Sequence, residues 1–250
     1  MFVRLVPALR SFAFAAVALA SLSCASKPPS GGAGTYRGVL VGTSQIGILE
    51  ITVAEASSGP LPASGTIDLG GTVVSLSGTL DRSNASISLS STDGYQLAGI
   101  SRPAYVFGSY YDSQDSGTFA LLLESANSSP IQLFCGSFVD TSTTGTYASQ
   151  TLPFAVTAVP SGAAICVALN NIWFGSLYAS DGLSCGTGGT LISGYVNADG
   201  GNQWGTGTDN QGNGDYGTWT VAPCGDNAAD GGAGSGPDVG TNVNADGEAD

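Results

Sequence analysis

The stretch Gly47-Ile48-Leu49-Glu50-Ile51-Thr52-Val53 decides the fold class of this chain. Apolar and polar side chains alternate along it, so that Leu49, Ile51 and Val53 lie on one face and the polar residues on the other. A period of two indicates a β-strand with one buried face. Similar short runs recur along the first half of the chain, separated by Gly, Ser, Asn and Asp, which favour turns.

The composition agrees with an all-β chain, since 38 of the 250 residues are glycine and only 10% are charged. Candidate strands follow one another at intervals of about ten residues, which favours an antiparallel meander because parallel neighbours need longer crossovers. No segment after the first two dozen residues predicts a helix. The predicted strands are Tyr36–Gly42, Gly47–Val53, Gly65–Leu69, Val73–Leu80, Ala85–Leu89, Tyr95–Ile100, Tyr105–Tyr111 and Thr118–Glu124.

The second half of the chain reads as a degenerate copy of the first. We therefore predict two repeated small barrels or sandwiches, a first module over residues 35–128 and a second over 129–224. One larger barrel or sandwich is the alternative, since Gly-Thr-aromatic also recurs wherever hairpins favour it. The parallel stretches are Gly108–Gln114 with Gly117–Phe119 against Gly205–Gln211 with Gly217–Trp219, and Gly34–Tyr36 against Gly136–Phe138.

The first 23 residues have the layout of a signal peptide. Arg4 and Arg10 come first, and the apolar run from Ser11 to Leu22 follows without an acidic residue. A membrane-spanning helix needs roughly 20 apolar residues, and this run is shorter. We therefore predict a leader over residues 1–23 that is removed, not a lasting membrane span.

Residues Ala20-Ser21-Leu22-Ser23-Cys24 resemble the lipobox of bacterial lipoproteins, with Ser21 and Leu22 in exchanged places. The resemblance implies cleavage before Cys24 and attachment of acyl chains such as palmitate, which would make a membrane the partner of this cysteine. Ala25 after the cysteine implies an outer membrane lipoprotein of the bacterial cell envelope. The alternative is ordinary cleavage after Ala20 or Ser23, which would leave a secreted or periplasmic protein.

Two segments have the composition of unfolded chain. Residues 24–34 combine the lipidated cysteine with a flexible Pro/Ser/Gly tether. Residues 225–250 form an acidic Gly/Asp tail, which we expect to be disordered. The whole chain has 19 acidic and six basic residues, and two of the basic ones lie in the leader. This charge excludes nucleic acid as the expected partner.

Cys24 is the odd member of five cysteines. The even number that remains predicts two disulfides in an exported protein. Three connectivities are possible. We favour Cys135–Cys224 with Cys166–Cys185, because the second pair then lies within the segment enclosed by the first.

The residue types exclude most common catalytic mechanisms. The chain has no histidine, and its single lysine, Lys27, lies in the tether. We therefore predict that the protein is not an enzyme. The alternative is a carboxylate-dependent polysaccharide hydrolase, for which Glu50 and Glu124 are the candidate acids.

No cofactor is expected, with calcium as the alternative. Asp209, Asn213 and Asp215 place oxygen atoms at alternate positions, as an EF-hand loop does, but Thr220 stands where that loop needs a glutamate. A hairpin turn explains the same residues and is favoured.

These observations predict a non-enzymatic, lipid-anchored envelope protein with a binding or structural role and a glycan or protein partner. The alternative is a calycin-like barrel that carries a small apolar ligand. Large aromatic residues are candidates for a ligand surface and also for core filling. They are Tyr105, Phe107, Tyr110 and Tyr111 in the first half, and Trp173, Trp204 and Trp219 in the second.

Overall fold

The computed structural model describes residues 31–43, 45–124, 130–141, 143, 148–159, 163–168, 171–176, 183–185, 192–197, 204–211 and 215–225. From residue 163 to residue 216 it describes the backbone of the strands and not their side chains. The predicted leader, Cys24 and residues 226–250 lie outside the described residues. Within the described chain, no helix is long and apolar enough to cross a membrane.

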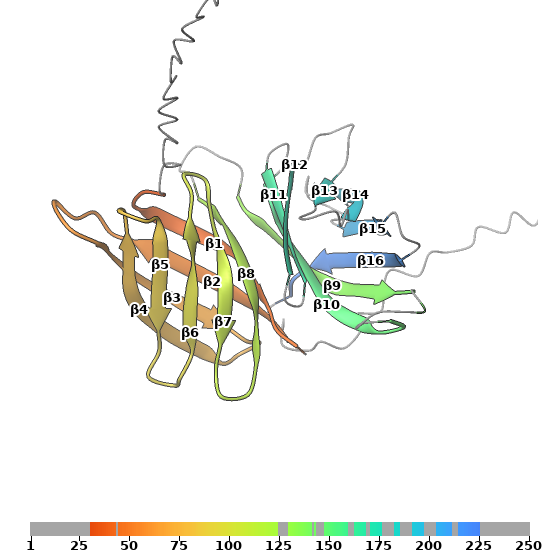
Figure 1. The fold of residues 1–250 in the computed structure, drawn as a ribbon, viewed down its shortest axis with the longest axis horizontal. Coiled ribbons are helices and arrows are strands. Elements are labelled where there is room, and N and C mark those ends of the chain that lie inside the picture. Colours follow the sequence, from red (N-terminus) through yellow and green to blue (C-terminus); the bar gives the residue numbers. More distant parts are fainter. Residues whose placement is uncertain are drawn as a thin grey trace, which may run out of the picture.

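The first eight strands form a closed antiparallel barrel, which confirms the all-β meander and all eight predicted strands of this half (Figure 1). Each strand pairs with the next along the chain, and the last returns to pair with the first. The strands are β1 (Gly34–Val41), β2 (Ile46–Val53), β3 (Leu61–Asp68), β4 (Val73–Asp81), β5 (Ser86–Ser90), β6 (Gln96–Ser101), β7 (Tyr105–Tyr111) and β8 (Ser116–Leu123).

The alternation along the strands fills the barrel interior. In β2, Leu49, Ile51 and Val53 are buried, whereas Glu50 and Thr52 are exposed. Every one of the eight strands contributes apolar side chains to the same buried cluster, whose largest members are three aromatic residues. Burying one such side chain contributes about 1.5–3 kcal/mol, so this core is the main source of stability of the barrel. The aromatic members are Tyr36, Tyr110 and Phe119.

Strand β3 begins at Leu61, four positions before the predicted start at Gly65. Pro62 breaks the sequence pattern, but its side chain is exposed and its carbonyl oxygen accepts a hydrogen bond from the Ala54 N–H at 2.8 Å. A proline is tolerated at the beginning of a strand because the ladder does not need its missing N–H there.

The second eight strands form one antiparallel sheet in the order β12-β11-β10-β9-β16-β15-β14-β13. Strand β9 pairs with β16, as β1 pairs with β8 in the barrel. Among the described residues, however, β12 and β13 stand at the two edges of the sheet and do not pair with each other. A repeated barrel is therefore not confirmed. The strands are β9 (Gln132–Asp140), β10 (Thr151–Ala158), β11 (Ala163–Ala168), β12 (Asn171–Ser176), β13 (Leu183–Cys185), β14 (Ile192–Asn197), β15 (Trp204–Gln211) and β16 (Asp215–Pro223).

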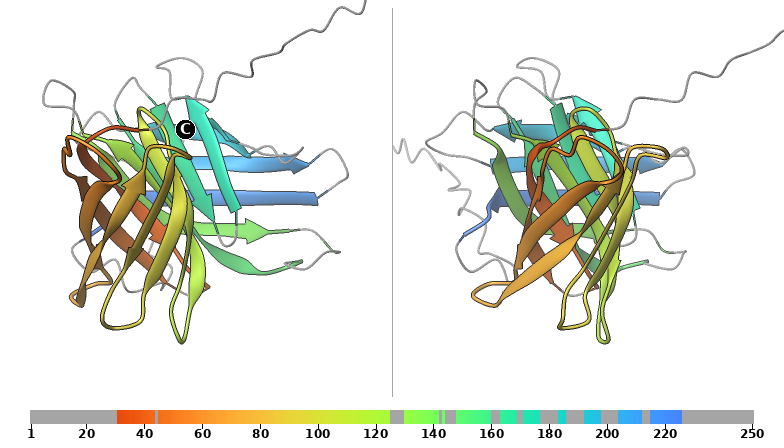
Figure 2. Two further views of the ribbon diagram at one scale, coloured as in Figure 1. Left: turned by 60° about the vertical axis from the view of Figure 1, so that its left-hand side comes forward. Right: turned by 90° about the vertical axis from the view of Figure 1, so that its left-hand side faces the viewer.

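The outer faces of β1 and β8 pack against the second sheet. A second apolar cluster joins Val39, Ala120 and Leu122 of the barrel to Ala155 of β10. The Thr157 hydroxyl donates a hydrogen bond across this interface to the Ala120 carbonyl oxygen at 3.2 Å. Both views of Figure 2 show the second sheet lying against one side of the barrel. Strands β1 and β8 are consequently buried on both faces.

The ladder between β1 and β8 depends on Gly38. A Cβ atom at this position would lie 2.0 Å from the Ala120 carbonyl oxygen and 2.7 Å from the Leu121 Cα atom. We expect Gly38→Ala to lower the free energy of unfolding by about 2 kcal/mol, because backbone atoms cannot yield as a flexible side chain can. Urea unfolding followed by circular dichroism measures this change.

The matched control is Gly32→Ala, where a Cβ atom would meet no atom within 4 Å. We expect that variant to unfold at the midpoint of the unsubstituted protein. An equal loss of stability in the two variants would contradict the close approach at Gly38.

Candidate functional site

Consecutive turns of the meander alternate between the two ends of the barrel. We call the end with the β1–β2, β3–β4, β5–β6 and β7–β8 turns the acidic end. The described residues of those turns and their flanking strand ends include four aspartates and no lysine or arginine. The other end, which we call the N-terminal end, carries Gly31–Gly34 and the β2–β3, β4–β5 and β6–β7 turns. The four aspartates are Asp68, Asp93, Asp112 and Asp115.

Asp115 joins the first and last turns of the acidic end. Its Oδ1 atom accepts hydrogen bonds from the backbone N–H of Thr43 at 2.9 Å and from the Thr43 hydroxyl. Its Oδ2 atom accepts from Gln45 Nε2 at 3.0 Å and from the Tyr110 hydroxyl at 2.8 Å. The Ser116 N–H also donates to Oδ1, at 2.8 Å. This carboxylate therefore holds β1 and β2 to β7 and β8.

These contacts set the charge state of Asp115. Burial alone would raise its pKa, but the hydrogen bonds from Thr43, Tyr110 and Ser116 outweigh burial and hold the pKa below its ordinary value. Burial and the neighbouring Asp115 carboxylate both raise the pKa of Tyr110 far above its ordinary value. Asp115 is thus a charged acceptor and Tyr110 a neutral donor, and their hydrogen bond serves to hold the strands together.

Two other aspartates at this end fix turn geometry. Asp68 Oδ1 accepts from the N–H groups of Gly70 and Gly71 at 3.0 Å each, and Asp112 Oδ1 accepts from two N–H groups of its own turn. Burial, with the nearby Asp112 carboxylate, raises the pKa of Tyr95 to about 12. In the described part of the chain, no group of three His, Cys, Asp or Glu residues is arranged to hold a metal ion.

A row of exposed polar side chains crosses the outside of the barrel from β2 to β7. Cross-strand register places each member directly beside the next, at the spacing of about 4.8 Å that separates neighbouring strands. None of its members is charged, and its last, a tyrosine, donates a hydrogen bond from its hydroxyl to the preceding glutamine. We call it the hydroxyl row: Thr52, Ser64, Ser77, Ser90, Gln96 and Tyr111.

Most of the candidate aromatic residues of the first half are at least partly buried. Tyr110 is 1% exposed, and Tyr105 and Phe107 pack against the interface with the second sheet with their ring centroids 5.9 Å apart. Tyr111 alone among these four is a largely open ring, 50% exposed. Alternation in the sequence predicts that every second residue of this strand is buried. It does not predict that a second sheet covers Tyr105 and Phe107, because that contact comes from a distant part of the chain.

The two candidate carboxylates of a hydrolase lie on the outer surface. Glu50 is exposed on β2 and pairs in register with Arg37 of β1 and Thr66 of β3. Glu124 is exposed just after β8, where its N–H donates to the Thr35 carbonyl oxygen at 2.8 Å. The two exposed side chains therefore do not line a buried cleft.

A disulfide joins Cys135 of β9 to Cys224, just after β16, as the favoured pairing has it. Cys166 and Cys185 lie in β11 and β13, and their side chains are outside the described residues, so their pairing stays a prediction. For the calcium candidates, Asp209 and Asp215 stand in the paired strands β15 and β16, as the favoured hairpin requires. Their side chains and all of Asn213 are outside the described residues.

The second sheet contains a buried indole that finds no hydrogen-bond acceptor among the described residues. Trp219 is 1% exposed and packs against Phe154 with ring centroids 5.1 Å apart, and its Nε1 atom has no hydrogen-bond partner among the described residues. The positions paired with it on the next two strands are Gly207 and then Gly194. Trp173 and Trp204 have no described side chains, so their role as ligand residues stays a prediction.

No known protein family, curated protein or solved structure matches this chain.

The contacts of Asp115 predict a pH-dependent contribution to stability. A folded-state pKa below the ordinary value stabilises the fold above about pH 4, and this contribution is lost as the pH falls through the lowered pKa. We expect Asp115→Asn to lower the free energy of unfolding by about 2 kcal/mol at pH 7, because five hydrogen-bond donors lose a charged acceptor. The difference from the unsubstituted protein should shrink as the pH falls through the lowered pKa of Asp115.

Urea unfolding at each pH measures the difference. Asp93→Asn at the same end is the matched control and should leave stability at neutral pH nearly unchanged. A pH-independent loss in Asp115→Asn would contradict a role of the charge.

Proposed function

We propose that the protein is a non-enzymatic, lipid-anchored protein of the bacterial cell envelope that binds a partner through the outside of its first barrel. The hydroxyl row is the observation that carries the binding role, because it is an uncharged and exposed surface with regularly spaced hydrogen-bond groups. It crosses the side of the barrel away from the second sheet (Figure 1). Anchoring is inferred from the lipobox-like residues that end at Cys24.

A glycan is the partner that this surface fits best. Hydroxyl and amide groups can donate and accept hydrogen bonds with sugar hydroxyls, and a half-exposed tyrosine ring offers an apolar face beside them. The hydroxyl row has no charged side chain that could form an ion pair with a charged partner. The filled interior of the first barrel speaks against the carrier alternative for this half, because apolar side chains occupy the space that a ligand would need.

We also propose that the two sheets are copies of one eight-stranded unit. In both, consecutive strands pair along the chain and the first strand pairs with the last. Gly136 corresponds to Gly38, since a Cβ atom at either would lie 2.0 Å from a carbonyl oxygen of the last strand. Trp219 then corresponds to Phe119, and each pairs with a buried residue of the first strand. The structural comparison therefore matches Gly136 with Gly38, whereas the sequence comparison matches Gly136 with Gly34.

Lipid anchoring predicts a mature protein that begins at an acylated Cys24. We expect intact-mass measurement of the membrane fraction to give the mass of residues 24–250 plus two or three acyl chains. Cys24→Ala should move the protein out of the membrane fraction without changing its circular dichroism. A mature protein that starts at Ser21 or Cys24 without lipid would contradict the anchor.

The binding surface predicts a role for the Tyr111 ring. We expect the protein to sediment with purified peptidoglycan sacculi and Tyr111→Ala to weaken this binding about tenfold, as loss of an aromatic contact commonly does. Tyr111→Phe keeps the ring and should retain most of the affinity. Val73→Ala is the matched control, because Val73 is an exposed side chain outside the row. Equal binding by all variants would show that the row is not the contact surface.

A further inference from the structure

We propose that the N-terminal end of the first barrel faces the membrane and that the acidic end points away from it. This orientation rests on the proposed acylation of Cys24. It adds to the anchor a defined contact surface, formed by the β2–β3, β4–β5 and β6–β7 turns, and an anionic lipid surface as the partner of that end.

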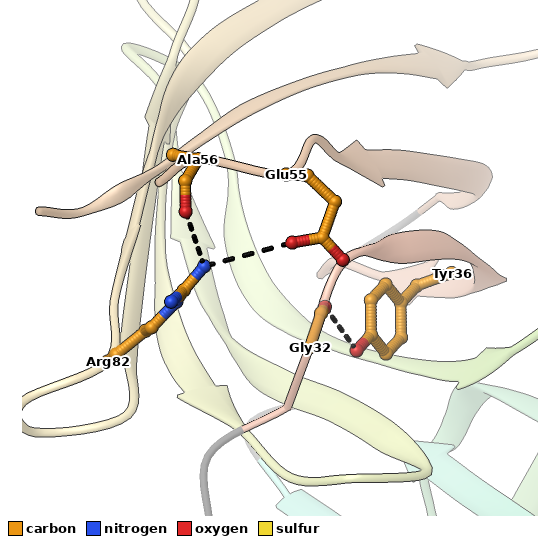
Figure 3. A network of polar contacts seen from close by, with 5 residues as sticks. All are labelled: Gly32, Tyr36, Glu55, Ala56 and Arg82. Carbon is orange, nitrogen blue, oxygen red and sulfur yellow. Dashed lines mark hydrogen bonds and ion pairs between the residues drawn. The ribbon is translucent and has the colours of Figure 1, made fainter. Parts of the chain in front are cut away.

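The first observation is where the chain enters the barrel. Gly31 is buried, and a Cβ atom there would lie 2.6 Å from the Arg102 carbonyl oxygen and 2.9 Å from the Tyr36 hydroxyl oxygen. The Tyr36 hydroxyl donates a hydrogen bond to the Gly32 carbonyl oxygen at 3.0 Å (Figure 3). The residues just before β1 are therefore fixed to the N-terminal end.

The second observation is the length of chain between this fixed point and Cys24. A fully extended chain advances at most about 3.6 Å per residue, so Cys24 lies no more than roughly 25 Å from Gly31. The barrel strands are themselves of comparable length. With Cys24 held at the membrane surface, the N-terminal end is kept close to the lipid headgroups, and only a barrel lying on its side would bring the acidic end equally close.

The distribution of charge selects between these two positions. All three arginines of the described chain are at or near the N-terminal end: Arg37 in the first half of β1, Arg82 in the β4–β5 turn and Arg102 in the β6–β7 turn. Three acidic residues accompany them, Glu55, Asp81 and Glu124, so the charges at this end balance. Arg82 lies 3.9 Å from Glu55 and donates to the Ala56 carbonyl oxygen (Figure 3).

The opposite end has aspartates without any basic residue in its described turns. Anionic headgroups attract arginine and repel carboxylates within a Debye length of the surface. The upright position therefore has the lower electrostatic energy.

Two matched probes at the ends of strand β5 test the orientation. Ser83 is exposed in the turn at the N-terminal end, and Thr92 is exposed in the turn at the acidic end. The full-length acylated protein carrying Ser83→Cys or Thr92→Cys is labelled with a fluorescent donor and reconstituted in vesicles of equal parts phosphatidylcholine and phosphatidylglycerol. A small fraction of headgroup-labelled lipid serves as energy-transfer acceptor, and the protein without either substitution serves as the labelling blank.

We expect transfer from position 83 to be several-fold stronger than from position 92. In the Arg82→Gln/Arg102→Gln background, this ratio should fall toward one on the same vesicles, because the N-terminal end then carries excess acidic charge, as the acidic end does. Equal transfer from the two positions in the unmodified background, or stronger transfer from position 92, would overturn the orientation while the acyl mass on Cys24 leaves the anchor standing. Absence of the acyl mass would instead overturn the proposed function.

Discussion

The ladder between β1 and β8 is the constraint on which the rest of the structure depends. It turns the first eight strands into a closed barrel and leaves the meander without an open edge. The inner faces of the two strands place Leu40 and Phe119 opposite each other in the core. Their outer faces form the surface on which the second sheet packs. One pair of strands thus supplies both the closure of the first unit and the interface with the second.

Local sequence predicted the strands of the first half because each strand has one buried and one exposed face. The alternation of Ser and Leu in β4 and β5 identifies the hydroxyl face directly. The strands that depart from alternation are the informative ones. Phe119–Leu122 is an uninterrupted apolar run, and its residues are buried alternately in the core and in the interface with the second sheet. Such a run indicates a covered strand but does not name the element that covers it.

The contacts of Asp115 join distant parts of the chain, and the residue types alone do not predict which parts meet. Asp115 receives its hydrogen bonds from Thr43 and Gln45, some 70 residues away in sequence. The separation of charge has a simpler origin. Because a meander alternates its turns between two ends, the four aspartates in every second turn gather at one end without a basic residue, whereas Arg82 and Arg102 in the intervening turns gather at the other beside Glu55 and Asp81. Once the meander is predicted, this polarity follows from the order of charged residues.

The barrel and the second sheet hold their first and last strands together by different interactions. In the barrel, Asp115 connects the last turn to the first by hydrogen bonds to a charged acceptor. In the second sheet, the Cys135–Cys224 disulfide ties β9 to the residue that follows β16, across 89 residues. A cross-link over a loop of this length restricts the unfolded chain and contributes about 4 kcal/mol. The barrel has eight ladders between neighbouring strands, whereas the described residues of the second sheet form no ladder between β12 and β13. The disulfide thus lies in the unit that has fewer ladders among its described residues.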